Sequence, residues 1–333
     1  MKKTTLIFAA LFAASFAMAQ NTATTTQTGN GNGAATTQNG SGNNSTVSQT
    51  GNNHEATVGQ SGTNNQSSLV IKSGSGSEVV VDQSGASNNA IFEGVGSVSG
   101  LQVQTGERNS AIAGTSQDFG NGSIIQQVQI GNDNSATAQR GTQNTNIEVY
   151  QTQVGNNNIA QANRLRGFNT LEVTQTQIGN DNQAYVNKQG EGSGQIYPST
   201  VLQSQLGDRN FANLNRASGE GSIGGETYSQ IQIGDDNQSR ILSARPTLLA
   251  STYQEGDFNT ARINQNDDLN SASISQEGDF NNGTIFQSGD SNFASMIQKG
   301  DLNLGTIDQT GGGNVANMMQ MGNSNMATIT QGN

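Results

Sequence analysis

The chain has 333 residues with no cysteine, no tryptophan, one histidine and a formal net charge of −11 at pH 7. The missing cysteines exclude disulfide bridges and a cysteine nucleophile, and an acidic chain without basic clusters is a poor partner for nucleic acid. Only 31% of the residues are apolar, so we expect a thin core whose stability depends largely on repeated hydrogen bonds.

Residues 1–19 have the pattern of a secretory signal peptide. Lys2 and Lys3 give a positively charged start, an apolar run follows, and Ala17-Met18-Ala19 has the spacing of a cleavage site. The apolar run is too short to span a bilayer. We therefore predict that the mature chain begins at Gln20 and is secreted.

Residues 20–103 repeat every eleven residues. Glutamine begins the unit and asparagine follows five residues later, at Gln27, Gln38, Gln49, Gln60, Asn32, Asn43 and Asn65. Lys72, Gln83 and Gly94 continue the phase after one inserted residue. The only histidine, His54, takes an asparagine position, and we interpret it as a substitute within the repeat. No other residue offers the base that a catalytic triad would require.

Residues 104–253 repeat over a longer distance. The motif Q-x-Q-[IVL]-G-x-x-N recurs, and its second glutamines are 24, 24, 28 and 27 residues apart, at Gln129, Gln153, Gln177, Gln205 and Gln232. We predict whole coils with longer strands or loops on one side. Pro198 and Pro246 fall in the probable loop insertions, where a missing amide donor does no harm.

Residues 254–333 restore the eleven-residue repeat without interruption. Its glutamines are Gln254, Gln265, Gln276, Gln287, Gln298, Gln309, Gln320 and Gln331. Its asparagines are Asn259, Asn270, Asn281, Asn292, Asn303, Asn314 and Asn325. Asparagine, alanine, isoleucine and the next glutamine are spaced two apart, which predicts one face of a β-strand, and the intervening glycine predicts a turn.

This periodicity predicts an all-β fold in which residues 20–333 form a single β-solenoid. Two eleven-residue units close one coil, and identical positions stack at roughly 4.8 Å, as in cross-β packing. About 27 strand units then give about thirteen two-strand coils and a rod of roughly 60–65 Å. We predict that stacked glutamines and asparagines form side-chain amide ladders.

Five acidic residues follow glutamine by three positions, in the predicted turns: Asp257, Asp268, Asp279, Asp290 and Asp301. Residues 22 apart should stack in two columns, one at each edge of the solenoid. A calcium-binding column is one interpretation, but the G-G-x-G-x-D pattern of calcium-binding β-rolls is absent. We favour the alternative that these turn carboxylates act as gatekeepers that limit lateral or premature aggregation.

The repeat Q-x-G-x-x-N-x-A-x-x-x-Q, as in the segment from Gln287 to Gln298, resembles the curlin repeat of bacterial curli subunits. The resemblance implies a secreted subunit that forms extracellular amyloid fibres for biofilm matrix and adhesion. It also implies a nucleator subunit and an outer-membrane export machinery as partners. The chain departs from the family pattern in its many repeats, in its stretched middle coils and in having only Gln20–Thr26 before the first repeat.

Both ends of the repeat region lack charge, since residues 20–54 and 309–333 contain no Asp, Glu, Lys or Arg. A solenoid that stays monomeric normally caps or charges its ends, so we expect an uncapped stack that polymerises head to tail. The alternatives are a nucleator, a non-polymerising adhesin or other binding solenoid, and a glycan lyase using acidic pairs such as Asp235-Asp236. We expect no enzyme activity, no cofactor, no metal and no small-molecule substrate.

Overall fold

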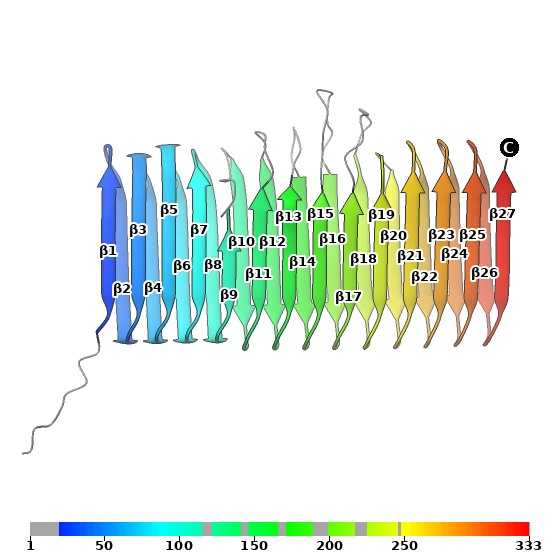
Figure 1. Ribbon diagram of the computed structural model, residues 1–333, viewed down its shortest axis with the longest axis horizontal. Helices are drawn as coiled ribbons and strands as arrows, with labels where there is room; N and C mark the ends of the chain where they lie inside the picture. Colours follow the sequence, from blue (N-terminus) through cyan, green and yellow to red (C-terminus); the bar gives the residue numbers. More distant parts are fainter. Residues whose placement is uncertain are drawn as a thin grey trace, which may run out of the picture.

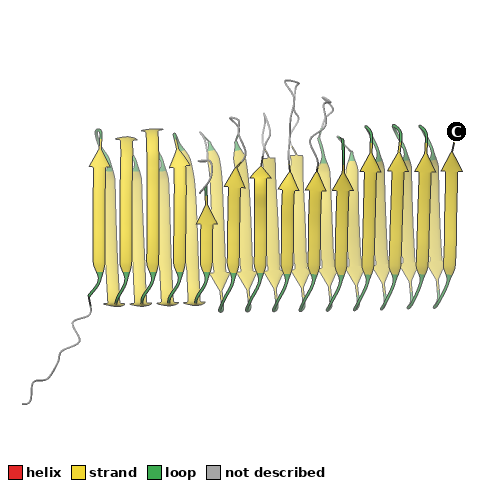
Figure 2. Cartoon of the chain, viewed as in Figure 1, coloured by secondary structure: helices red, strands yellow, loops and turns green. Residues whose placement is uncertain are grey.

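The computed structural model describes residues 20–114, 122–140, 146–165, 171–188, 199–216, 225–245 and 248–332. Throughout these residues the regular elements are β-strands, numbered β1 to β27. Odd-numbered strands form a 14-stranded sheet A and even-numbered strands form a 13-stranded sheet B. The chain alternates between the two sheets and winds into a long flat coil, so the prediction of an all-β solenoid of about thirteen two-strand coils is confirmed (Figures 1 and 2).

The strands are short and similar in length. Sheet A consists of β1 (Thr22–Thr28), β3 (Asn44–Asn52), β5 (Gln66–Ser75), β7 (Asn89–Val95), β9 (Ser110–Ala113), β11 (Ser135–Arg140), β13 (Ile159–Leu165), β15 (Gln183–Lys188), β17 (Phe211–Arg216), β19 (Gln238–Ser243), β21 (Thr260–Asn266), β23 (Asn282–Ser288), β25 (Leu304–Thr310) and β27 (Met326–Gly332). Sheet B consists of β2 (Gly33–Ser41), β4 (Glu55–Thr63), β6 (Glu78–Ala86), β8 (Val98–Glu107), β10 (Ser123–Ile130), β12 (Ile147–Val154), β14 (Leu171–Ile178), β16 (Ser199–Leu206), β18 (Thr227–Ile233), β20 (Leu249–Glu255), β22 (Ser271–Glu277), β24 (Phe293–Lys299) and β26 (Val315–Met321).

All pairing within each sheet is parallel, and it sets equivalent positions of the repeat beside each other. In the C-terminal part Gln254 pairs with Gln276 and Gln265 with Gln287, a spacing of 22 residues. In the middle part Gln177 pairs with Gln205, a spacing of 28 residues. The longer coils therefore keep the same pairing of equivalent positions, and the additional residues belong to the connections between strands.

The rod has two edges, where the chain passes from one sheet to the other. The additional residues of the longer coils all belong to connections at one of these edges. Strands of sheet B pass to sheet A through short Gly-x-x-Asn turns along the whole rod, for example Gly155–Asn158, and we call this side the short-turn edge. The longer connections join sheet A to sheet B, and we call that side the loop edge. Residues 1–19, Pro198 and Pro246, on which the signal-peptide and loop predictions rest, lie outside the described residues.

One detail of the predicted phase is wrong. Gln49 pairs with Ile71, not with Lys72, and Ile71 in turn pairs with Gly94. Ile71 is buried in the core whereas Lys72 points outward, because the inserted residue is accommodated after this position, where Ser73 and Gly74 both have positive φ. An apolar side chain therefore replaces glutamine at this level of sheet A.

The core lies between the two sheets, and each sheet contributes one layer of inward-facing side chains to it. Inward positions carry small or branched apolar residues such as Val149, Ala160, Val173 and Ile263, all fully buried. Outward neighbours in the same strands are half-buried, so the burial pattern alternates along each strand. Among the described residues no helix is long and apolar enough to cross a membrane.

Turn glycines set how closely the coils can stack. Gly155 has φ of +120°, and a Cβ added there would lie 1.9 Å from the carbonyl oxygen of Gly179 in the next coil. The position therefore needs a residue with no side chain for two reasons, the left-handed backbone and the close approach of another backbone.

We predict that Gly155→Ala lowers the midpoint of urea unfolding. The backbone conformation alone costs about 1–2 kcal/mol for a residue with Cβ, and the overlap with Gly179 adds to it. The matched control is Gly33→Ala, where an added Cβ meets no heavy atom within 4 Å. Equal midpoints for the two variants would contradict this account of the turn.

Candidate functional site

A continuous column of glutamines runs along the inside of sheet B. In each pair the amide Nε2 donates to Oε1 of the glutamine one coil nearer the C-terminus; Gln153 donates to Gln177 at 2.8 Å, and Gln254 to Gln276 at 2.9 Å. The column contains Gln38, Gln60, Gln83, Gln104, Gln129, Gln153, Gln177, Gln205, Gln232, Gln254, Gln276, Gln298 and Gln320. We call it the main glutamine ladder.

The same amides also tie the two sheets together. Gln177 Nε2 donates a second hydrogen bond to the carbonyl oxygen of Ile159 in sheet A, at 3.0 Å. Sheet A has its own glutamine column only near the ends of the rod, where Gln27 donates to Gln49 and where Gln265, Gln287, Gln309 and Gln331 follow in sequence. Each buried glutamine therefore stabilises stacking and sheet-to-sheet packing together.

Asparagines form a second column along the short-turn edge. The backbone N–H of Asn281 donates to Oδ1 of Asn259 at 2.9 Å, while Asn281 Nδ2 donates to the Gly300 carbonyl oxygen at 2.7 Å. The backbone and side chain of one asparagine together thus link three successive coils. The N–H to Oδ1 bonds run without interruption through Asn21, Asn43, Asn65, Asn88, Asn109, Asn134, Asn158, Asn182, Asn210, Asn237, Asn259, Asn281, Asn303 and Asn325.

The loop edge has a shorter column of the same kind. Asn270, Asn292 and Asn314 are joined by the same N–H to Oδ1 bonds in the C-terminal coils. Near the other end His54 takes the equivalent place: its N–H donates to Asn32 Oδ1, and its Nδ1 accepts from the Ser77 N–H. His54 is fully buried, so its position matches the interpretation that it substitutes for asparagine.

The five turn aspartates lie in the two predicted columns. Asp257 N–H donates to Asp279 Oδ1 at 2.8 Å, and Asp279 N–H to Asp301 Oδ1 at 3.0 Å. Asp268 N–H donates to Asp290 Oδ1 at 3.0 Å on the loop edge. Each accepting carboxylate thereby gives a backbone N–H of the preceding coil its hydrogen-bond partner. No cluster of three or more metal-binding side chains occurs among the described residues, and the gatekeeper role of these aspartates stays a prediction.

A second buried glutamine column in sheet B was missed by the sequence reasoning. It joins the first glutamines of the Q-x-Q motifs at 2.7–2.8 Å, through Gln102, Gln127, Gln151, Gln175, Gln203 and Gln230. The column begins where Val81 pairs with Gln102 and ends where Gln230 donates to Ser239 Oγ. The signal was available, because two glutamines separated by one residue must face the same way in a strand.

Ion pairs cross between coils in the middle of the rod. Arg209 donates to both oxygens of Asp236 at 2.7–2.8 Å, and Arg108 does the same to Asp133 at 2.7 Å. These hydrogen bonds hold the pKa of Asp236 and Asp133 below the usual range of a carboxyl group. A further pair, Arg216 with Glu226 at 3.2 Å, is almost fully buried at the loop edge.

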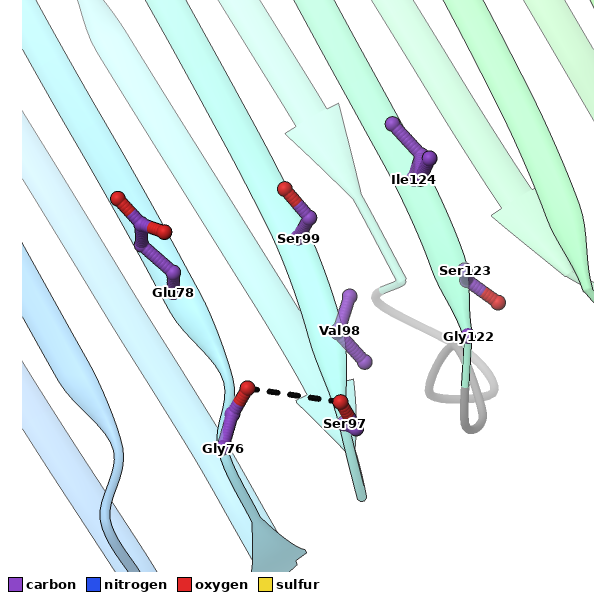
Figure 3. A pocket seen from close by; sticks show the side chains of 8 residues that line it. All are labelled: Gly76, Glu78, Ser97, Val98, Ser99, Gly122, Ser123 and Ile124. Atoms are coloured by element: carbon purple, nitrogen blue, oxygen red, sulfur yellow. Dashed lines mark hydrogen bonds between the residues drawn. The ribbon is translucent and has the colours of Figure 1, made fainter.

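The solenoid has a small hollow of about 200 Å³ on its loop edge (Figure 3). Glu78, Val98 and Ser123 are among its lining residues, and Ser97 Oγ donates to the Gly76 carbonyl oxygen at 3.4 Å. The lining offers one carboxylate with serine hydroxyls and backbone, and it brings no histidine to the hollow.

The two ends of the rod are uncovered in the described chain. On β1 the inward side chains Ala23, Thr25 and Gln27 are exposed, although their partners one coil later, such as Val47 and Gln49, are fully buried. On β27 the inward positions are half-buried. The end strands thus present unpaired backbone together with the residues of the ladders (Figure 1).

Comparison with protein families identifies the repeat. The curlin associated repeat matches residues 20–51, 29–62, 51–85, 268–300 and 300–332. These matches lie in the two parts of the chain where the coils are short, and the same ladders continue between them. A comparison with curated proteins found no match for the chain.

We predict that Gln177→Leu lowers the thermal unfolding midpoint. Leucine keeps most of the volume but removes one of the two acceptors of Gln153 Nε2 and leaves Gln205 Oε1 without its donor. Each buried group left unsatisfied costs about 1–3 kcal/mol. Thr176→Val, at the adjacent outward position, is the control and should melt close to the parent protein by circular dichroism. If both variants melt alike, the ladder does not carry the stability assigned to it.

Proposed function

Because the chain is a curlin-repeat protein, we propose that it is a structural subunit that polymerises end to end into a curli-like extracellular amyloid fibre. The observation that carries the proposal is the state of the two ends. Both expose edge strands that bear the glutamine, asparagine and alanine positions of the buried coils. An edge of this kind is a template for adding another strand.

The proposed mechanism is templated strand addition. The end coil offers backbone donors and acceptors with side-chain amides at fixed spacing, and an incoming copy satisfies both sets. Each hydrogen bond contributes about 0.5–1.5 kcal/mol net, so the stabilisation comes from forming many of them at once. A head-to-tail contact does not close on itself, and the product is therefore a filament.

The resemblance extends the proposal to location and partners. We propose that the fibre lies outside the cell, at its surface, where it contributes to adhesion and biofilm matrix. A nucleator subunit and an outer-membrane export machinery are the expected partners. A solenoid built from structural repeats supports this role over an enzymatic one.

Two other functions are tested by the same preparation. A nucleator would seed a second curlin-repeat protein when present in trace amounts, and a non-polymerising adhesin would stay monomeric at high concentration. Negative-stain images of incubated mature chain, residues 20–333, distinguish a filament from a monomer. A lasting monomer would refute the proposed function.

We predict that Thr328→Pro strongly slows fibre elongation. The N–H of Leu304 in β25 donates forward to Asn325, and Leu304 pairs with Met326. Because hydrogen bonding alternates along a parallel strand, the N–H of Thr328 points away from β25 toward the next copy. Proline removes this donor, and an edge strand tolerates proline.

The control for this prediction is Thr328→Val, which keeps the backbone amide and the branched side chain. Elongation is followed by thioflavin fluorescence after adding sheared parent fibres as seeds. We expect the proline variant to elongate at least tenfold more slowly and the valine variant to match the parent chain. Equal rates for proline and parent would show that β27 is not part of the joint.

A further inference from the structure

The described residues form 27 strands, an odd number, and the same sheet extends further at both ends of the rod. Sheet A starts with β1 and finishes with β27, whereas sheet B starts with β2 and finishes with β26. Each end of the rod is therefore a step, in which sheet A extends beyond sheet B by one strand. Two copies that meet end to end must fit these two steps together.

Resting on the proposed function, we propose that successive copies in the fibre are related by about a half-turn around the long axis. In this joint β1 of one copy extends sheet B of the preceding copy by pairing with β26. Its β2 then extends sheet A by pairing with β27. The two steps interlock, and neither sheet misses a strand.

A joint without rotation leaves a hole. If β1 followed β27 in sheet A, β26 and β2 would be two strand spacings apart in sheet B, about 9.6 Å instead of about 4.8 Å. One layer of core would be lost, and both facing backbones would remain unpaired. Unsatisfied backbone groups in a buried position are costly, so the interlocked joint is favoured.

The strand directions allow the half-turn. All strands of one sheet run the same way, and the two sheets run in opposite directions (Figure 1). Rotation by a half-turn about the rod axis exchanges the two sheets and reverses the strand direction as well. The rotated β1 is therefore parallel to β26, as every other pair in the rod is parallel.

The residues at the two ends match in this arrangement. Aligned in register, Gln27 of one copy pairs with Gln320 of the preceding copy and Gln38 pairs with Gln331. The turn of Gly29–Asn32 then covers the turn of Gly322–Asn325. Both turns have positive φ at their first and third residues, with Gly29 at +117° and Gly322 at +98°.

The polarity of the ladders fits a head-to-tail joint. Within the chain each glutamine Nε2 donates toward the C-terminal end, so Gln320 and Gln331 can donate onward. No described coil precedes β1 and β2, so Oε1 of Gln27 and of Gln38 can accept. Donors at one end meet acceptors at the other, whereas a head-to-head contact would bring two acceptors together.

The half-turn also exchanges the two edges of the rod, and the end coils are built to permit this. The loop edge carries short four-residue turns in the first and last coils, Gly29–Asn32 and Gly311–Asn314. The longer connections lie between β9 and β20, away from the joint. At the joint, the four-residue turn Gly29–Asn32 on the loop edge of one copy therefore meets the equally short turn Gly322–Asn325 on the short-turn edge of the preceding copy.

The fibre repeat follows from this geometry. Along one side of the fibre, the 14 strands of one copy are followed by the 13 strands of the next. The axial repeat is then 27 strand layers, or roughly 130 Å, and it contains two copies. An unrotated joint would repeat after 14 layers, roughly 67 Å, with one copy.

Engineered disulfides test the joint directly, because the natural chain has no cysteine. Thr24, Asn317 and Thr328 are exposed outward positions. In the half-turn joint Thr24 pairs with Asn317 of the preceding copy, whereas in the unrotated joint it pairs with Thr328. Neighbouring strands are roughly 4.8 Å apart, within the range that a disulfide spans.

We expect fibres of Thr24→Cys with Asn317→Cys to form covalent multimers after mild oxidation. Fibres of Thr24→Cys with Thr328→Cys should stay largely monomeric on denaturing gels, and so should Thr24→Cys alone. Multimers from the Thr24–Thr328 pair, or none from the Thr24–Asn317 pair, overturn the half-turn joint. A covalent dimer from Thr24→Cys alone overturns it in favour of a head-to-head contact.

Unsubstituted fibres provide a second measurement that does not depend on the variants. Electron-microscopic averaging should place the loop edges of successive copies on alternating sides of the fibre, so that the pattern repeats after 27 layers, roughly 130 Å. Loop edges all on one side, with a repeat of roughly 67 Å, would overturn the inference while fibre formation stood. A chain that forms no filament at all refutes the proposed function, and the joint falls with it.

Discussion

The hydrogen bond between equivalent amide side chains of adjacent coils is the constraint on which the rest of the structure depends. A glutamine bonds its neighbour at 2.7–2.9 Å only if the same position of the repeat returns at the same place in every coil. That requirement fixes the parallel register, places Gly155 beside Gly179, and limits the core to side chains that fit a constant spacing. A slip of one residue would turn every ladder amide outward.

The constraint also explains where the chain tolerates variation. The asparagine column runs along the short-turn edge from Asn21 to Asn325, so a turn there that changed length would break its bonds. Among the described residues of the middle coils, the loop edge shows no such continuous column. Insertions therefore collect on that side, and the buried pair of Arg216 with Glu226 lies there too. The second glutamine column is confined to the same coils: Val81 takes the equivalent position before Gln102, and Thr252 takes it after Gln230.

The sequence allowed the strands, the alternation between sheets and the main glutamine ladder to be predicted. Positions two residues apart share one face of a strand, and a period of eleven residues returns the same positions to that face in every coil. The sequence did not allow the level of Ile71 to be predicted, because an inserted residue can be absorbed before or after a strand and only packing decides. The ion pair of Arg209 with Asp236 was missed, although the 27-residue spacing of Gln205 and Gln232 already placed the two residues at equivalent positions of successive coils. The open ends were expected from their lack of charge, but the one-strand step was not considered, since it depends on the parity of the strand count.

The distribution of charge connects stability within the chain to addition of another copy. Within the rod, stacked aspartates are tolerated because their carboxylates accept backbone hydrogen bonds, as in the C-terminal coils, or pair with arginine, as Asp133 does with Arg108. The outer side of an end coil has no neighbour, and a charge facing that side would lose water as another copy covered it. In the proposed fibre, uncharged terminal coils would avoid this cost, and glutamine and asparagine would gain the same bonds from another chain as from their own. The interactions that hold one coil on the next therefore do not distinguish a coil of the same molecule from a coil of another.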